Sequence, residues 1–195
     1  MRKTLYIFIF LISNYSFGQS KILTDSIQKP GIYLTVEHVS NNWPVGFPNL
    51  KIIKDSIKYG TVGNIKYMDA YSLDISKEQA EKIGPILGFS DGKDIYLTPF
   101  SRSYSKGATF HKVEKICHFL YFDGIKEVNM PQQNLFWLTD CQNLLDLNKK
   151  ERISNLTNGK IKRIISDNKE LVKKFKKEKK KYSLYKKYLK EYCEE

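Results

Sequence analysis

Cysteine and histidine are scarce in this chain, with three of each among its 195 residues. None of them shows the C-x2-C or H-x3-H spacing of a structural zinc site, so we interpret the histidines as scattered residues of a half-exposed sheet. The chain also lacks a P-loop and a G-x-G-x-x-G motif. Neither a metal site nor a cofactor is therefore expected. The side chains weighed as metal ligands are His38, His111, Cys117, His118 and Cys141.

The sequence has no hydrophobic run long enough to cross a bilayer, which takes about 20 apolar residues. Its longest run, LYIFIFLI, covers the eight residues from Leu5 to Ile12 and lies between a basic start and the small residues around Gly18. This order is typical of a cleaved secretory signal peptide. We expect residues 1–18 to be removed after Gly18, and the mature chain to be exported to the periplasm or secreted. No cysteine lies near the cleavage site, so a lipoprotein anchor is not expected.

Positive charge is concentrated at one end of the chain. Residues 19–148 carry 14 Lys and Arg against 14 Asp and Glu, whereas residues 149–195 carry 17 against 7. The formal net charge of +12 therefore comes almost entirely from the last quarter of the sequence. Such a field attracts anionic surfaces, including lipid headgroups, lipopolysaccharide and teichoic-type polymers. Nucleic acid is not an expected partner of an exported protein.

The strand and turn signals predict an α+β fold, mainly antiparallel sheet built from hairpins, in residues 19–156. Two short helices are expected within it. Thr35 is the predicted N-cap of one, and Ser76 with Gln79 has the form of a capping box at the start of the other. Residues 50–74 have the composition of strands, without a clear register.

Two Asp-Gly pairs lie between apolar runs, as hairpin turns do. They are Asp91-Gly92 and Asp123-Gly124. We expect a hairpin at each, and two further short strands at 135–138 and 144–147.

Residues 157–195 are predicted to form a lysine-rich helical segment, packed on the sheet domain or extending from it. A long basic helix is expected from about Asn168 to Glu191, with Asp167 and Glu170 as a capping pair. Its apolar residues share one stripe at 100° per residue. These residues are Leu171, Phe175, Tyr182, Tyr185, Leu189 and Tyr192.

Three interpretations of this helix are open. In the first, the stripe docks on the chain's own sheet and the lysines form a solvated outer face. In the second, the lysines bind an anionic surface. In the third, the stripe joins two chains in a coiled coil with Glu178 at one seam position. The lysines expected to contact an anionic surface are Lys173, Lys174, Lys176, Lys177, Lys180, Lys181, Lys186 and Lys187.

Three cysteines outside the cytoplasm permit one disulfide and leave one thiol. We expect Cys117 and Cys141 to pair, because both lie in strand-like segments while Cys193 is close to the C-terminus, where chain ends fray. The alternative is that all three thiols are free.

Several segments resemble small exported proteins of flavobacteria and related Bacteroidota, a group without an assigned function. The segments are PGIYLTVEHVSNN (30–42), LDISKEQAEKIGPILGFSDGKDIYL (73–97), YFDG (121–124) and NLLDLN (143–148), together with the signal peptide and the lysine-rich tail. The resemblance implies a bacterial periplasmic or surface setting. It carries no functional residue across.

We therefore expect an exported, non-catalytic binding or envelope-associated protein, whose partners are anionic envelope components or another envelope protein. The alternative is a small exported hydrolase or thiol enzyme. Its nucleophile would be Cys117 or Cys141, with His111 or His118 as the base and Asp140 orienting the histidine.

Overall fold

The computed structural model describes residues 28–46, 50–61, 63–99, 109–130, 135–149, 151–179 and 181–194. The predicted signal peptide and its cleavage site lie outside these residues. The strands are β1 (Gly31–Tyr33), β2 (Ile52–Thr61), β3 (Asn64–Leu73), β4 (Gly88–Ser90), β5 (Ile95–Leu97), β6 (His111–Lys112), β7 (Glu114–Ile116), β8 (Phe119–Met130), β9 (Leu135–Asp146) and β10 (Ser154–Asn155). The helices are α1 (Val36–Ser40), α2 (Lys77–Ile83), α3 (Asn158–Ile164), α4 (Lys169–Lys177), the 3-10 helix η2 (Tyr182–Leu184) and α5 (Tyr185–Cys193). Antiparallel sheets and helices occur together, which confirms the predicted α+β class.

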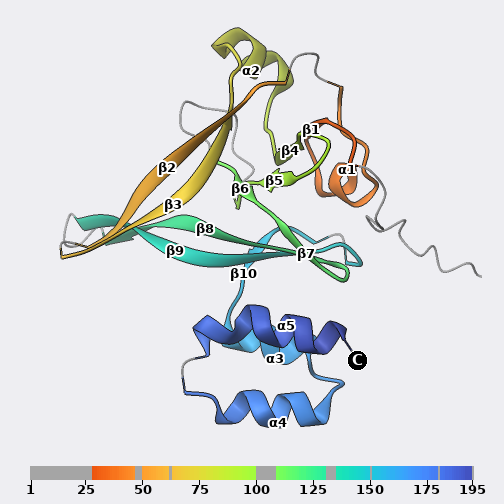
Figure 1. Cartoon of the computed structure of the whole chain (residues 1–195), viewed down its shortest axis with the longest axis vertical. Coiled ribbons are helices and arrows are strands. Elements are labelled where there is room, and N and C mark those ends of the chain that lie inside the picture. Colours follow the sequence, from red (N-terminus) through yellow and green to blue (C-terminus); the bar gives the residue numbers. More distant parts are fainter. Residues whose placement is uncertain are drawn as a thin grey trace, which may run out of the picture.

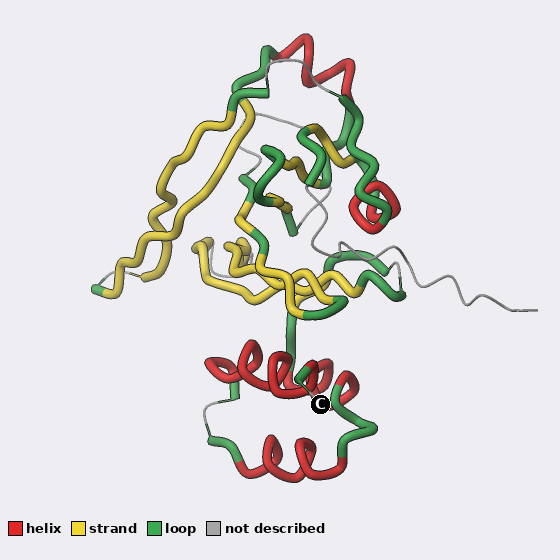
Figure 2. Tube along the Cα trace, turned by 45° about the vertical axis from the view of Figure 1, so that its right-hand side comes forward, coloured by secondary structure: helices red, strands yellow, loops and turns green. Residues whose placement is uncertain are grey.

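The sheet β10-β9-β8-β7 lies in the middle of the molecule (Figure 1). The helices α3, α4 and α5 lie on one side of it. The sheet β1-β4-β5-β6, the long β2–β3 hairpin and the short helices α1 and α2 lie on the other side, and the turned view in Figure 2 shows the same order. The middle sheet is therefore covered on both faces.

Strand β8 supplies apolar side chains to both faces of the middle sheet. Phe119 and Tyr121 belong to the core that the sheet shares with the helices, and Leu120 and Phe122 belong to the core on the opposite side. Successive side chains of a strand point to opposite faces, so a continuous apolar run is what a doubly covered strand requires.

The predicted starts of both short helices are confirmed. Thr35 caps α1, where its Oγ1 accepts a hydrogen bond from the His38 N–H at 3.2 Å. Ser76 and Gln79 form the full capping box of α2, in which the Ser76 N–H donates to Gln79 Oε1 at 2.8 Å and the Gln79 N–H donates to Ser76 Oγ at 3.2 Å. Each cap satisfies backbone donors that the helix itself cannot pair.

The hairpin predicted at Asp91-Gly92 is also confirmed, since β4 and β5 pair in antiparallel register around it. The Asp91 carboxylate accepts from the backbone N–H groups of Lys93 and Asp94, at 2.8 and 2.7 Å. Gly92 has a φ of +94°, a conformation that favours glycine. The turn is thus determined by its own residues.

The turn predicted at Asp123-Gly124 is wrong, because both residues lie inside β8 and pair with β9. The chain turns earlier, at Cys117 and His118 between β7 and β8, and Cys117 has a φ of +43° there. An Asp-Gly pair permits a turn without requiring one. The twelve-residue pairing of β8 with β9 depends on contacts distant in the sequence.

The strands expected in residues 50–74 are present as the hairpin of β2 and β3. The two short strands expected at 135–138 and 144–147 are instead parts of a single strand, β9, whose partner is the equally long β8.

The long basic helix expected from Asn168 to Glu191 is absent, because α4 ends at Glu178, whose backbone is extended. The chain then reverses and α5 runs from Tyr185. In a continuous helix Phe175 and Tyr185 would lie about 15 Å apart along the axis. In the structure their ring centroids are 6.4 Å apart, so the break allows both aromatic rings to enter one core.

The cap of α4 is one residue later than expected. Asn168 Oδ1 accepts from the Leu171 N–H at 2.8 Å, whereas the Asp167 carboxylate accepts from the Tyr192 hydroxyl at 3.1 Å. Asp167 therefore joins the start of α4 to the end of α5.

The apolar face of the helical segment docks on the chain's own sheet, as the first interpretation predicted. The helical residues buried in this shared core are Ile161, Ile165, Leu171, Phe175, Tyr185, Tyr188 and Leu189, and the sheet residues are Ile116, Phe119, Tyr121 and Leu144. Since most of the stripe is buried within one chain and the long helix is broken, the coiled-coil seam that the third interpretation needs is not formed.

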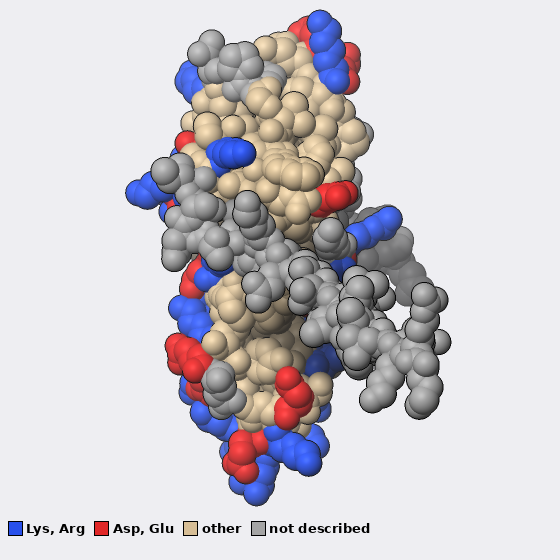
Figure 3. Space-filling view, turned by 90° about the vertical axis from the view of Figure 1, so that its right-hand side faces the viewer, with Lys and Arg blue, Asp and Glu red and all other residues tan. Residues whose placement is uncertain are grey.

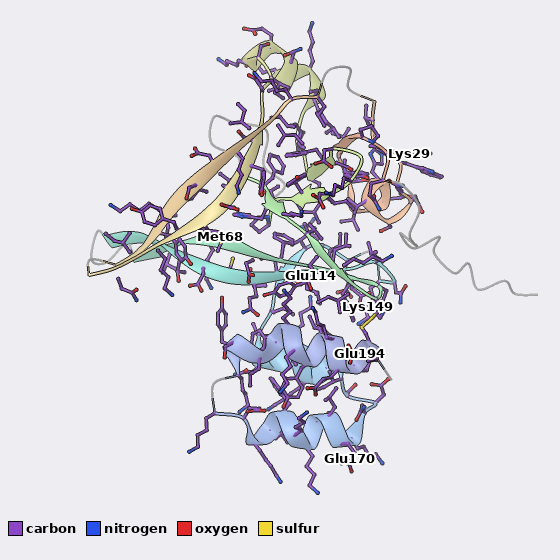
Figure 4. The ribbon with its side chains drawn as sticks, viewed as in Figure 1. Lys29, Met68, Glu114, Lys149, Glu170 and Glu194 are labelled. Atoms are coloured by element: carbon purple, nitrogen blue, oxygen red, sulfur yellow. A yellow bond between two sulfur atoms is a disulfide. The ribbon has the colours of Figure 1, made fainter. Side chains whose placement is uncertain are left out.

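The predicted Cys117–Cys141 disulfide is wrong, because Cys117 is bonded to Cys193 with Cα atoms 6.0 Å apart (yellow bond in Figure 4). Cys141 is a free, buried thiol. Cys117 lies next to the end of β8 that pairs with Asp146 of β9. Cys141 is five residues from Asp146 along β9, which corresponds to about 17 Å at the rise of a strand. The segment that ends in Cys193 is not separate from the core, since α5 packs on the sheet and carries Cys193 to the β7–β8 turn.

We expect the double substitution C117S/C193S to lower the free energy of unfolding by about 4 kcal/mol, because the bond closes a long loop in the unfolded chain. The residues it joins are 76 positions apart. Urea denaturation of the oxidised protein measures this, and peptide mapping without reductant should recover Cys117 linked to Cys193. Recovery of Cys141 in the bridged peptide, or a loss below 1 kcal/mol, would contradict the assignment.

Candidate functional site

The eight lysines of α4 and α5 divide into two groups according to their partners. Those in the first group are tied to carboxylates that face the helices, and the stick view in Figure 4 places Glu114 between the middle sheet and α5. Lys186 and Lys190 both pair with Glu114, the latter at 2.8 Å. Lys174 and Lys187 both pair with Glu191, at 2.8 and 3.7 Å.

These pairs connect the helices to the sheet and to each other. Glu114 lies on β7, so its two lysines fasten α5 to the sheet, and Glu191 lies on α5, so Lys174 fastens α4 to α5. Burial by itself raises the pKa of Glu114, but its hydrogen bonds to Lys186 and Lys190 outweigh burial and leave that pKa below its usual value. The first group is therefore structural, and its charges are partly neutralised.

The second group lies on the outer face of α4 and is exposed. It consists of Lys169, Lys173, Lys176 and Lys177, which we call the α4 ridge. At 100° per residue they point away from Leu171 and Phe175, the buried residues of the same helix. Among the described residues no carboxylate lies within ion-pair distance of any of these four lysines. Figure 3 shows Lys and Arg gathered at the helical end of the molecule, with acidic residues among them.

The structure thus separates the eight lysines predicted from the sequence. Lys173, Lys176 and Lys177 are on the ridge. Lys174, Lys186 and Lys187 are paired with carboxylates, and Lys181 donates to the Glu178 carbonyl and lies 5.8 Å from the centre of the Phe175 ring. Lys180 lies outside the described residues. Lys169 was missed, although its helical position relative to Leu171 would have placed it on the outer face.

The predicted Cys/His catalytic set is not assembled around Cys117, because that sulfur is in the disulfide. His118 is the next residue in the turn, and its Nε2 lies 3.8 Å from the Asp146 carboxylate. Burial lowers the pKa of His118, and the attraction of Asp146 opposes this. The histidine therefore has a carboxylate beside it and no free thiol within its own turn.

Cys141 and His111 come together in a buried cluster on the other face of the middle sheet. Cys141 pairs with Gly124, and a Cβ at Gly124 would lie 2.8 Å from Asn143 Nδ2 and 3.3 Å from His111 Cδ2. Asn143 Nδ2 is 3.4 Å from Cys141 Sγ. The ring of His111 stacks on Phe122, with centroids 6.3 Å apart.

This cluster is unsuited to nucleophilic catalysis. Cys141 is only 3% exposed and His111 only 2%, so a substrate has no access to either. Burial raises the pKa of the Cys141 thiol and lowers the pKa of His111, so both groups are held neutral. Neither ring nitrogen of His111 has a hydrogen-bond partner of good geometry among the described residues, although the Asp69 backbone faces the ring.

Residues 88–92, GFSDG, match the G-x-S-x-G pattern of a hydrolase nucleophile elbow. That elbow presents its serine between a strand and a helix. Here Ser90 is fully buried at the end of β4, the chain continues into strand β5, and the serine hydroxyl accepts from the Gly92 N–H at 3.1 Å. The pattern therefore forms a hairpin turn and not a nucleophile.

Within the described ranges, no cluster of three or more His, Cys, Asp or Glu side chains has a metal-binding arrangement. No helix in this part of the chain combines the length and the apolar character that a bilayer span requires. No protein-family model matches the chain, and neither a curated protein nor a solved structure shows significant similarity to it.

We expect G124A to lower the free energy of unfolding by about 1–3 kcal/mol, because the added methyl group overlaps Asn143 and approaches His111 in a packed core. The matched control is G159A in α3, where an added Cβ meets nothing closer than 3.9 Å. Alanine favours a helix over glycine by up to about 1 kcal/mol, so the control should be neutral or stabilising. Urea denaturation of both variants checks this, and an unchanged stability of G124A would contradict the close packing.

Stability should fall as the pH drops below about 6.5, the usual pKa of histidine. Burial lowers the pKa of His111 in the folded state, so the unfolded chain binds the proton more readily and acid favours unfolding. Between pH 7.5 and 5.5 the free energy of unfolding should depend less steeply on pH in H111F than in the native protein, by up to about 1 kcal/mol per pH unit. H118N serves as the comparison for the less buried histidine. A slope that H111F leaves unchanged would show that His111 accepts its proton while folded.

Proposed function

We propose that this chain is an exported, non-catalytic binding protein that attaches to anionic envelope surfaces through the α4 ridge. The observation that carries the proposal is the division of the lysines. The ridge lysines have no carboxylate partner among the described residues, while the other four lysines of α4 and α5 are paired with Glu114 or Glu191.

The position of α4 supports this role. Of α3, α4 and α5 it lies furthest from the middle sheet in Figure 1, so its outer face approaches a flat surface before the other two helices do. Its inner face is held by Leu171 and Phe175, which are buried. A surface can therefore contact the lysines without disturbing the core.

The expected strength comes from adding small contributions. A lysine close to an anionic membrane contributes about 1 kcal/mol, and this attraction decays within a Debye length of about 10 Å at 0.1 M salt. Binding through four such lysines should be reversible, sensitive to salt and largely indifferent to the fine structure of the surface. This is the behaviour of a peripheral attachment and not of a catalytic site.

The test is co-sedimentation of the mature protein with vesicles of phosphatidylcholine containing about one third phosphatidylglycerol. Charge reversal on the ridge, K173E/K176E/K177E, should weaken binding at least tenfold, since each reversal removes about 1 kcal/mol of attraction and adds repulsion. The matched control K58E/K66E/K82E makes the same change in net charge on exposed lysines of β2, β3 and α2. It should change binding by less than threefold.

A second ridge variant, K173Q/K176Q/K177Q, removes the same charges without adding carboxylates, so it should also weaken binding if charge reversal alone does not unfold the protein. Circular dichroism verifies the fold of every variant. Binding should decline steeply between 0.05 and 0.3 M salt. An equal loss in the control would show that overall charge and not the ridge attracts the surface, and an absence of vesicle binding by the native protein would reject the proposal.

A further inference from the structure

The ridge contains a small hollow whose lining differs from the linings of two other hollows in the helical unit. It has a volume of about 270 Å³ and is lined by Ser166, Lys169, Val172, Lys173 and Lys176. Three of the four ridge lysines thus border one concave site. The fourth, Lys177, lies outside it and borders a different hollow, of about 590 Å³.

The charge in this hollow is of one sign. No acidic residue lines it, whereas Glu170, Glu178 and Glu191 line the hollow beside Lys177, and Asp167 and Glu170 line another, of about 730 Å³, beside the disulfide. The charged side chains that line the small hollow are therefore all lysines, with no carboxylate to compete for them.

The remaining two side chains determine which anion fits. The Ser166 hydroxyl donates to the Arg163 carbonyl at 2.9 Å, so it has no proton left for a ligand and the lysines are the donors. Val172 is half-buried and gives the hollow an apolar side. Most of the exposed lining is hydrocarbon, so Val172 and the lysine stems form the walls of the hollow and the three ammonium groups can reach an anion at its rim.

We propose that this hollow binds the phosphate ester of an anionic lipid headgroup, with the first ester carbons against Val172. This inference rests on the proposed attachment through the α4 ridge and identifies its specific contact. The phosphodiester of a lipid such as phosphatidylglycerol carries one negative charge and has four oxygens arranged tetrahedrally around phosphorus, so three ammonium groups can approach it from different directions. A carboxylate offers two oxygens in one plane and one charge, so it engages fewer of them.

The test compares phosphate with carboxylate at equal surface charge. One set of phosphatidylcholine vesicles contains phosphatidylglycerol and the other contains oleate, adjusted to the same zeta potential. We expect the native protein to bind the phosphate vesicles at least fivefold more tightly. K169M, K173M and K176M should each reduce that preference to below twofold.

The matched control is K177M, which removes the same charge from the same ridge outside the hollow and should keep the preference. V172N adds a second readout, because it leaves every charge in place and should still weaken binding to phosphate vesicles by about threefold or more. Glycerol 3-phosphate in solution separates the lipid from a free phosphate ester. It should bind the protein at least tenfold more weakly than the vesicles do.

The outcomes separate this inference from the proposed function. Equal binding to phosphate and carboxylate vesicles, with K177M as harmful as the other three, would overturn the phosphate site and leave ridge attachment standing. Glycerol 3-phosphate binding as tightly as the vesicles would overturn the assignment to a lipid. Failure to bind either kind of vesicle would reject both proposals.

Discussion

The packing of aromatic side chains from α4 and α5 against β8 is the contact on which the helical end of the molecule depends. Phe175, Tyr185 and Tyr188 meet Phe119 and Tyr121 in one core, and the Phe175 and Tyr188 rings form an edge-to-face pair with centroids 4.8 Å apart. Burying a side chain of this size contributes about 1.5–3 kcal/mol. The break in the helix, the position of the C-terminus and the disulfide all follow from the need to bring these rings together.

The same docking decides what each lysine does. Once α5 lies on the sheet, Lys186 and Lys190 face Glu114, and once α4 lies beside α5, Lys174 faces Glu191. The outer side of α4 receives no such partner from the described residues. Helices α4 and α5 thus carry one set of neutralised lysines and one charged face, the ridge, which contributes to the positive field that attracts a distant anion.

The features predicted correctly from the sequence are those determined within a few residues. Thr35 and Ser76 cap their helices through the next turn, and the Asp91-Gly92 hairpin is closed by its own side chain. The failures involve distant partners. Gly124 was predicted to form a turn, but it is a glycine inside β8 because Asn143 lies against it. The C-terminal helix breaks so that Phe175 and Tyr185 can meet, and the disulfide forms where the docking of α5 places Cys193. For the same reason the lysine-rich segment was recognisable, while its division into paired and free lysines was not.

Lysine footprinting of the native protein in solution tests the central claim most directly. A short pulse of an amine-acylating reagent, followed by peptide mass spectrometry, compares the rate of modification at each lysine. The account predicts fast modification of Lys173, Lys176 and Lys177 and at least several-fold slower modification of Lys186 and Lys190, whose ammonium groups are held by Glu114. Equal rates for the two sets would contradict the docking of α5 and the division of charge that follows from it.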